Sequence, residues 1–180
     1  MKWDQLKTIE TNRLVLRKMS ENDALDLFLL RSHPSSSEYT DSLPDKSIED
    51  TRIYINKMNI GVDSNRWRIW AIQEKSINKV IGSISIWNIN EEENKGEFGF
   101  GIHPDYWNQG YMTEALLATV DYGFSDMKLS TIEAYTEETN KRSRNLLERC
   151  GFNNQKTIQE KGFLKPQVFN MVIYVIDNKE

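Results

Sequence analysis

The residues best suited to chemistry lie in a glycine-containing loop at residues 107–115, which reads WNQGYMTEA. Residues 97–102 before the loop alternate as a strand does, whereas the apolar residues after it recur at helical spacing. The loop therefore opens a helix whose first N–H groups have no intrahelical partner and carry a partial positive charge. Such a helix end binds anions, above all a pyrophosphate. An ordinary strand-to-helix turn without a ligand is the other interpretation of this loop alone.

A second segment, residues 140–152, reads NKRSRNLLERCGF and ends at a glycine typical of helix termini. Together the two segments resemble the GNAT superfamily of acetyl-CoA-dependent N-acetyltransferases. The first matches the family's pyrophosphate loop, aromatic-Trp-x-x-Gly-Tyr-x-Thr-Glu-Ala, and the second its Asn-x-x-Ser…Gly-Phe helix. Residues 11–17 are similar to the first strand of the branch that includes the ribosomal-protein N-terminal acetyltransferases. The resemblance covers residues 11–176.

The resemblance implies that acetyl-CoA binds along the loop and the strand before it. Backbone N–H groups of the loop would hold the pyrophosphate, which explains how an acidic chain could bind so negative a ligand. The loop departs from the family pattern at Asn108 and Met112, where small residues are usual, and at Trp107, which replaces an Arg or Gln. The implied cofactor-binding residues are Phe100, Gly101, Ile102, Asn108, Gln109, Gly110, Tyr111, Met112, Thr113 and Asn140.

Acetyl transfer to an amine also needs a base for the amine proton and an acid for the leaving thiolate. The resemblance implies a glutamate base, for which Glu97 and Glu160 are the two candidates. We favour Glu97, because few residues separate it from the loop, and a solvated edge glutamate is the alternative. Ser143 is the candidate acid, and a capping hydroxyl in the first helical turn is the alternative for it.

Composition indicates a soluble globular protein with one domain over residues 1–180. With a net charge of −4, the chain lacks the surplus of basic residues that nucleic-acid-binding proteins carry, so no nucleic-acid partner is expected. The sequence contains no apolar run long enough to cross a bilayer, which favours a cytoplasmic location without a membrane partner. Cys150 is the single cysteine and lies on an apolar helix stripe, which predicts burial. One cysteine and two separated histidines predict no metal site.

The elements that position these residues are predicted to form a mixed, mainly antiparallel α/β sheet of about seven strands with flanking helices, the GNAT fold. Strands are expected near residues 13–19, 67–73, 80–89, 97–102, 130–136, 152–160 and 169–176, and helices near 21–32, 47–58, 114–127 and 141–150. Short connections make the early strands antiparallel, whereas a helical crossover makes the strands around Phe100 and Ile132 a parallel central pair. Ligands bind at the carboxyl ends of such strands, where the loop and the second segment both begin.

The acceptor is expected to bind under residues 34–64, the region that covers the acceptor site in the resembled family. This region has few apolar residues and several turn formers, so it is expected to be the most mobile part. A protein N-terminus is the favoured acceptor, and a small amine such as an antibiotic or a polyamine is the second. The third interpretation is an acyl-CoA sensor without catalysis. The apolar last strand would support a homodimer by pairing at a sheet edge.

Overall fold

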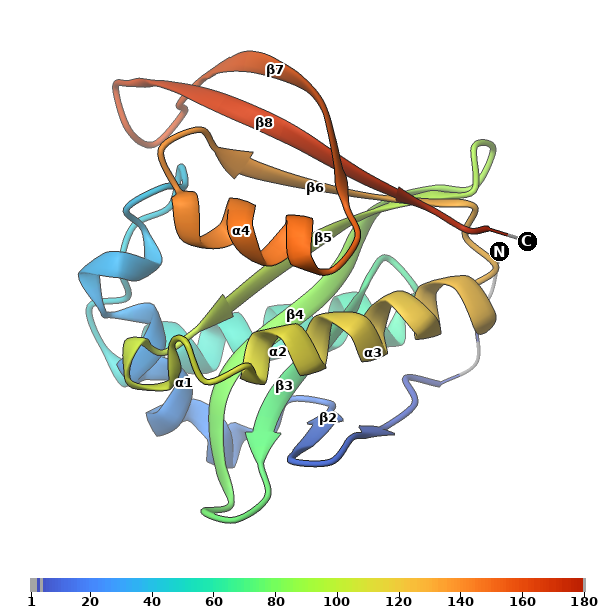
Figure 1. Ribbon diagram of the computed structural model, residues 1–180. Helices are drawn as coiled ribbons and strands as arrows, with labels where there is room; N and C mark the ends of the chain where they lie inside the picture. Colours follow the sequence, from blue (N-terminus) through green and yellow to red (C-terminus); the bar gives the residue numbers. More distant parts are fainter. Residues whose placement is uncertain (1–2, 4, 180) are drawn as a thin grey trace.

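The computed structural model, which describes residues 3 and 5–179, is built on one sheet of eight strands in the order β1-β2-β3-β4-β5-β6-β8-β7 (Figure 1). The strands are β1 (Ile9–Glu10), β2 (Leu14–Arg17), β3 (Arg68–Glu74), β4 (Lys79–Asn90), β5 (Lys95–Ile102), β6 (Thr131–Glu137), β7 (Asn153–Lys161) and β8 (Val168–Asp177). β5 and β6 are parallel and the other neighbours are antiparallel, which confirms the predicted fold class. The short β1, paired with β2, is the strand beyond those expected.

Helices cover both faces of the sheet. They are α1 (Ala24–Arg31), α2 (Ile48–Asp63), α3 (Tyr111–Ser125) and α4 (Lys141–Arg149), with short 3₁₀ turns at Glu21–Asp23, Pro34–Ser36 and Pro104–Tyr106. Figure 1 shows α3 and α4 in front of the sheet and α1 and α2 behind it. The alternation of β3 creates the two cores, because Trp70 packs with α3 and α4 residues and its neighbour Ile69 packs with α1 and α2 residues. No helix in the described residues combines the length and apolar character needed to cross a lipid bilayer.

Residues 34–64, expected to be mobile, contain the 16-residue helix α2. Ser47 and Asp50 form a capping box at its start. The chain before it is fixed by Asp45, whose carboxylate accepts hydrogen bonds from Arg31 Nε at 2.7 Å and Nη2 at 2.8 Å. Polar contacts hold this part of the segment in place, and the expectation of mobility, which is based on apolar residues and turn formers, does not take them into account.

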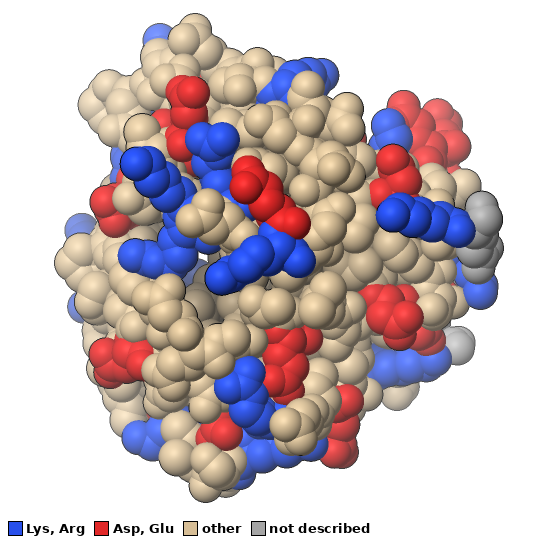
Figure 2. All heavy atoms as spheres, in the orientation of Figure 1, with Lys and Arg blue, Asp and Glu red and all other residues tan. Residues whose placement is uncertain are grey.

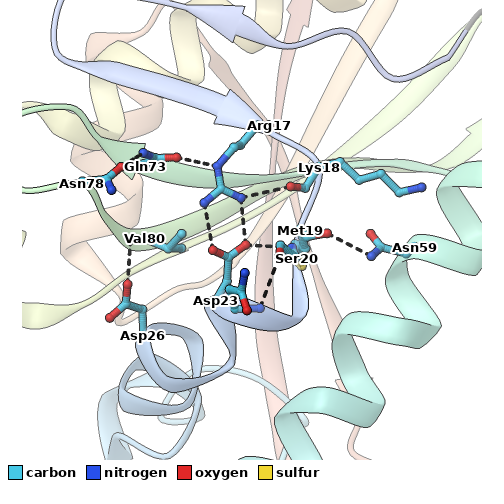
Figure 3. A network of polar contacts seen from close by, with 11 residues as sticks. Arg17, Lys18, Met19, Ser20, Asp23, Asp26, Asn59, Gln73, Asn78 and Val80 are labelled. Atoms are coloured by element: carbon cyan, nitrogen blue, oxygen red, sulfur yellow. Dashed lines mark hydrogen bonds and ion pairs between the residues drawn. The ribbon is translucent and has the colours of Figure 1, made fainter.

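A polar network attaches α1 to the sheet (Figure 3). Arg17 at the end of β2 donates to both carboxylate oxygens of Asp23, each at 2.8 Å. Asp23 Oδ2 also accepts the Ser20 N–H at 2.7 Å, which closes a capping box in front of α1. From α1 itself, Asp26 Oδ2 accepts the N–H of Val80 on β4 at 3.0 Å. The helix is thus held by two strands.

β5 and β6 pair only over their first halves, from Lys95 opposite Thr131 to Phe98 opposite Ala134. Beyond Phe98, the described part of β5 pairs with β4 alone, so the sheet parts at its centre. β8 lies between β6 and β7, where both of its sides are paired. The expectation that this apolar strand forms a sheet edge is therefore wrong. At this end of the sheet the edge strand is β7, whose side chains are mostly exposed and polar.

Cys150 and the two histidines contribute to packing and to local turns. Cys150 is buried in the core beneath α4, and burial raises the pKa of its thiol. His33 Nδ1 accepts the N–H of Ser35, and His103 Nδ1 accepts that of Asp105. Each histidine thereby caps a 3₁₀ turn.

Candidate functional site

A cavity of about 710 Å³ opens where β5 and β6 part. Its lining includes every residue predicted to bind the cofactor and the predicted acid, namely Phe100, Gly101, Ile102, Asn108, Gln109, Gly110, Tyr111, Met112, Thr113, Asn140 and Ser143. The two candidate bases, Glu97 and Glu160, are not among the lining residues. Sequence reasoning missed other lining residues, among them Ser83 and Ser85 of β4, Tyr39 and Thr40 before α2, and Arg142 and Arg149 of α4.

The start of α3 opens on this cavity. The first intrahelical hydrogen bond runs from Glu114 N–H to the Gly110 carbonyl at 3.0 Å, so the N–H groups of residues 111–113 have no helical acceptor. Gly110 has a φ of 79° and Asn108 a φ of 58°, both in the left-handed region. Asparagine tolerates that conformation better than other side chains, so Asn108 serves in place of a smaller residue. Met112 turns its side chain into the core, where it is 7% exposed.

The parted half of β5 has space beside it for an extended ligand. A Cβ placed on Gly101 would meet no atom within 4 Å. Gly99 and Gly101 pair with Ser85 and Ser83 of β4, and all four line the cavity. The backbone edge of this half, which faces away from β4, has no strand partner among the described residues. Open space, free backbone groups and a helix N-terminus together fit a chain-like ligand that ends in a phosphate.

Positive charge reaches the cavity from α4. Figure 2 shows Lys and Arg side chains gathered over this helix beside a hollow in the surface. The Arg142 guanidinium carbon lies 3.3 Å from the centroid of the Trp107 ring, and Trp107 Nε1 donates to the Ile102 carbonyl at 3.0 Å. Trp107 thus holds the Arg142 cation beside the loop. Arg142 and Arg149, seven residues apart, share one helix face, and that spacing is the signal in the sequence.

Asn140 caps α4 and thereby leaves the Ser143 hydroxyl free of that task. Asn140 Oδ1 accepts the Ser143 N–H at 3.2 Å. The capping role is therefore held by Asn140, whereas Ser143 lines the cavity.

Glu97 lies on the same face of β5 as the cavity-lining Gly99, about 7 Å before it along the strand. It pairs with Glu133 of β6, and Asn88 Nδ2 donates to its Oε2 at 3.2 Å. Burial is the main cause that raises the pKa of the Glu97 carboxyl to about 7. The charges of Glu133 and Glu160 raise it further, whereas the Asn88 hydrogen bond lowers it. Glu160 therefore acts on Glu97 from β7.

Tyr135 joins these carboxylates on the same sheet face. Its hydroxyl donates to Glu133 Oε2 at 3.0 Å. Burial, then this hydrogen bond, and then the nearby negative charges raise the pKa of the Tyr135 phenol to about 12. Sequence reasoning missed Tyr135, although its alternation with Glu133 on β6 puts both on one face.

A strap at the cavity, residues 35–41, is bound to the β7–β8 loop. Its residues Tyr39 and Thr40 line the cavity. The Asp41 carboxylate accepts the backbone N–H groups of Phe163 at 2.6 Å, Leu164 at 3.0 Å and Lys165 at 2.8 Å. In return, Lys165 Nζ donates to the Thr40 carbonyl at 2.8 Å. Desolvation would raise the pKa of Asp41, but these hydrogen bonds hold it below its ordinary value.

Comparison with known proteins places this geometry in a family. The model of the Acetyltransferase (GNAT) domain matches residues 13–153. The crystal structure of a GNAT-family acetyltransferase from Bacillus anthracis is 26% identical, with a TM-score of 0.84 over 97% of this chain and 100% of that one.

Two further relatives have named acceptors. The spermidine N(1)-acetyltransferase of Vibrio cholerae is 22% identical over 93% of this chain and 95% of its own length. The structure of the ribosomal-protein-S5-alanine acetyltransferase of Vibrio fischeri has a TM-score of 0.82 at 19% identity, over 97% of this chain and 98% of that one, and shares the fold.

Proposed function

Because the chain belongs to the GNAT acetyltransferase family, we propose that it moves the acetyl group of acetyl-CoA to a primary amine, with the N-terminal amine of a protein as the first acceptor class. One observation carries the proposal. A helix N-terminus with free N–H groups opens on the cavity in the parted sheet, and the strand that lines this cavity also carries Glu97, a carboxyl with a pKa near neutrality.

The carrier side of the cavity fits acetyl-CoA, which when bound supplies the acetyl thioester. The N–H groups of residues 111–113 would hold the pyrophosphate, and Arg142 on Trp107 would place a positive charge beside it. Because the Asn140 side-chain oxygen caps α4, the N–H groups of the same amide would be left to donate hydrogen bonds to the pantetheine arm. The open space beside Gly101 would receive that arm.

Two side chains would move the protons. Glu97 would accept a proton from the incoming ammonium group, directly or through a water, so that the neutral amine attacks. A carboxyl with a pKa of about 7 is well matched to an amine at neutral pH. Ser143 would give its hydroxyl proton to the departing thiolate as the carbon–sulfur bond breaks. Glu160, which is exposed on β7, is the rival base.

Two acceptor classes have support from specific observations. An α-amino group has a pKa of about 8 and lysine one of about 10.4, so a base of pKa about 7 is better matched to the protein N-terminus. The carboxylates of Glu97, Glu133 and Glu160 on one sheet face favour instead an amine with several positive charges. A polyamine, like the acceptor of the Vibrio cholerae relative, is therefore the second candidate.

The test is thiol release from acetyl-CoA with a panel of acceptors. The panel holds a peptide with a free N-terminus, the same peptide with a blocked N-terminus and a free lysine, spermidine and an aminoglycoside. We expect steady release with the free N-terminal peptide, and mass spectrometry should locate the acetyl group on its α-amine. Faster turnover of spermidine would assign the polyamine instead. Tight CoA binding without release for any amine would make the protein an acyl-CoA sensor.

A further inference from the structure

Arg13, in the turn between β1 and β2, contacts the glycine loop and the first turn of α3 at three residues. Arg13 Nη1 donates to the Gln109 carbonyl at 2.8 Å, and Nε donates to Glu114 Oε2 at 2.7 Å. Its guanidinium carbon lies 4.2 Å from the centroid of the Tyr111 ring. One side chain therefore touches the residue before Gly110, the first residue of α3 and the end of its first turn. Arg13 is not among the residues that line the cavity.

The bond to Gln109 fixes the direction of a peptide group. In a trans peptide the C=O and the following N–H point in opposite directions, and the described chain contains no cis peptide bond. Because Arg13 is not a lining residue, we take the Gln109 carbonyl that it binds to point away from the cavity, so that the following Gly110 N–H points toward it. Gly110 has the left-handed φ of 79° that this turn requires. Arg13 thereby adds one more donor to the free N–H groups of α3.

The bond to Glu114 offsets a negative charge that would otherwise repel an anionic ligand. Glu114 lies in the first turn of α3, where a bare carboxylate would compete for the partial positive charge of the helix end. Its Oε1 accepts the Thr11 hydroxyl at 2.6 Å and the Arg13 N–H at 2.8 Å, in addition to the guanidinium on Oε2. Desolvation would raise the pKa of Glu114, but these hydrogen bonds keep it below its ordinary value. Glu114 is thus ionised and neutralised by its partner.

We infer that Arg13 is a positioning residue for the carrier: it aims the loop N–H groups at the pyrophosphate and neutralises the acidic residue beneath them. The inference rests on the proposed function, because it takes the anion at α3 to be the pyrophosphate of acetyl-CoA. Arg13 would act through the loop, without touching the ligand.

The experiment compares Arg13→Met and Arg13→Lys with the wild type for CoA affinity by calorimetry. Arg17→Met is the matched control, since Arg17 lies at the other end of β2 and makes a bidentate pair with Asp23 instead of contacting the loop. We expect Arg13→Met to weaken CoA binding by about ten- to a hundred-fold, in the range for lost charge-assisted hydrogen bonds. Arg13→Lys, which keeps the charge beside Glu114 but not the planar fork, should lose less. Arg17→Met should keep the wild-type affinity.

Acetyl-pantetheine, which lacks the pyrophosphate, separates positioning from a general loss of structure. The ratio of kcat/KM for acetyl-CoA to that for acetyl-pantetheine should fall by the same ten- to hundred-fold in Arg13→Met, with the acetyl-pantetheine value itself unchanged. Equal losses with both donors, or unchanged CoA affinity in a folded Arg13→Lys or Arg13→Met protein, would overturn the inference and leave the proposed function standing. Absence of CoA binding by the wild type would overturn both.

Discussion

At the scale of single residues, the chemistry of Glu97 depends on neighbours from other strands. Its own segment, KGEFGF, contains nothing that distinguishes a base from a solvated glutamate. Burial within the sheet is the main cause that raises its pKa to about 7, and the negative charges of Glu133 on β6 and Glu160 on β7 add to this effect. The sequence therefore identifies the residue as a candidate, whereas its tuning follows from the strand order.

Replacing Glu97 with glutamine should lower kcat/KM by about a hundred-fold or more at pH 7, the usual worth of a general base. The wild-type rate should rise as the pH passes about 7, where this carboxyl ionises, and the variant should lack that inflection. Its deficit should shrink above the pKa of the acceptor amine, which is then neutral without help. The measurement is kcat/KM against pH for Glu97→Gln and Glu160→Gln. A deficit that shrinks with pH only in Glu160→Gln would transfer the base role to Glu160.

The same substitution should stabilise the fold at alkaline pH. Since the pKa of Glu97 is raised in the folded state, the folded protein disfavours the charge, and ionisation costs stability as the pH rises from about 4.5 to about 7. Glu97→Gln cannot ionise, so its Tm should exceed that of the wild type at pH 8. The two should converge near pH 4. A lower Tm for the variant at pH 8 would contradict the raised pKa.

At the scale of elements, the strap and the β7–β8 loop form one unit through Asp41. Residues far apart in the sequence make this clasp, and its strength comes from three backbone N–H groups meeting one carboxylate. Because Tyr39 and Thr40 of the strap line the cavity, the clasp fixes one wall of that cavity, which we propose to be the wall that the acceptor meets.

Asp41→Asn should loosen this wall, because the neutral amide accepts these hydrogen bonds more weakly. We expect the KM for the amine to rise by about three- to thirty-fold, as for the loss of one or two such bonds, while CoA affinity stays unchanged. Hydrogen exchange of the strap, residues 35–41, should accelerate in parallel. Asp63→Asn, which removes an exposed salt bridge with Lys18 at 2.6 Å, is the control. Unchanged amine KM with faster strap exchange would show that the wall does not contact the acceptor.

The elements themselves were predictable where one local signal was enough. Gly110 between a strand and an apolar-striped helix, and Gly151 after α4, were sufficient for the loop and the helix end. The bonds between Asp41 and the β7–β8 loop and the contact of Arg142 with Trp107 were not predictable, because both depend on tertiary contacts. Arg144 on the same helix instead donates to the Tyr174 hydroxyl and the Glu138 carbonyl, both at 3.1 Å.

At the scale of the whole molecule, the sheet is in effect two sheets joined over a short parallel pairing. One carries α1 and α2 on its back, and the other ends in the β7–β8 hairpin. The antiparallel neighbours β3, β4 and β5 and the parallel pair of β5 and β6 followed from the connections in the sequence. The position of β8 between β6 and β7 and the place where pairing of β5 with β6 stops did not. β5 remains strand-like through Ile102, so no residue type marks the end of its pairing with β6 after Phe98.

This break in pairing gives the sheet an internal edge, where the backbone groups of residues 99–102 that face away from β4 have no strand partner among the described residues. A bound pantetheine arm would lie along this free edge as a further strand would. The amides along the edge should therefore exchange more slowly when CoA is present, as measured by hydrogen–deuterium exchange. Equal exchange with and without CoA would contradict this. By mass action, CoA at a hundred times its Kd should add about 2.7 kcal/mol to the free energy of unfolding. Resistance to heat and to proteases would then depend on the concentration of the acetyl donor, and the protein would be degraded fastest when the donor is scarce.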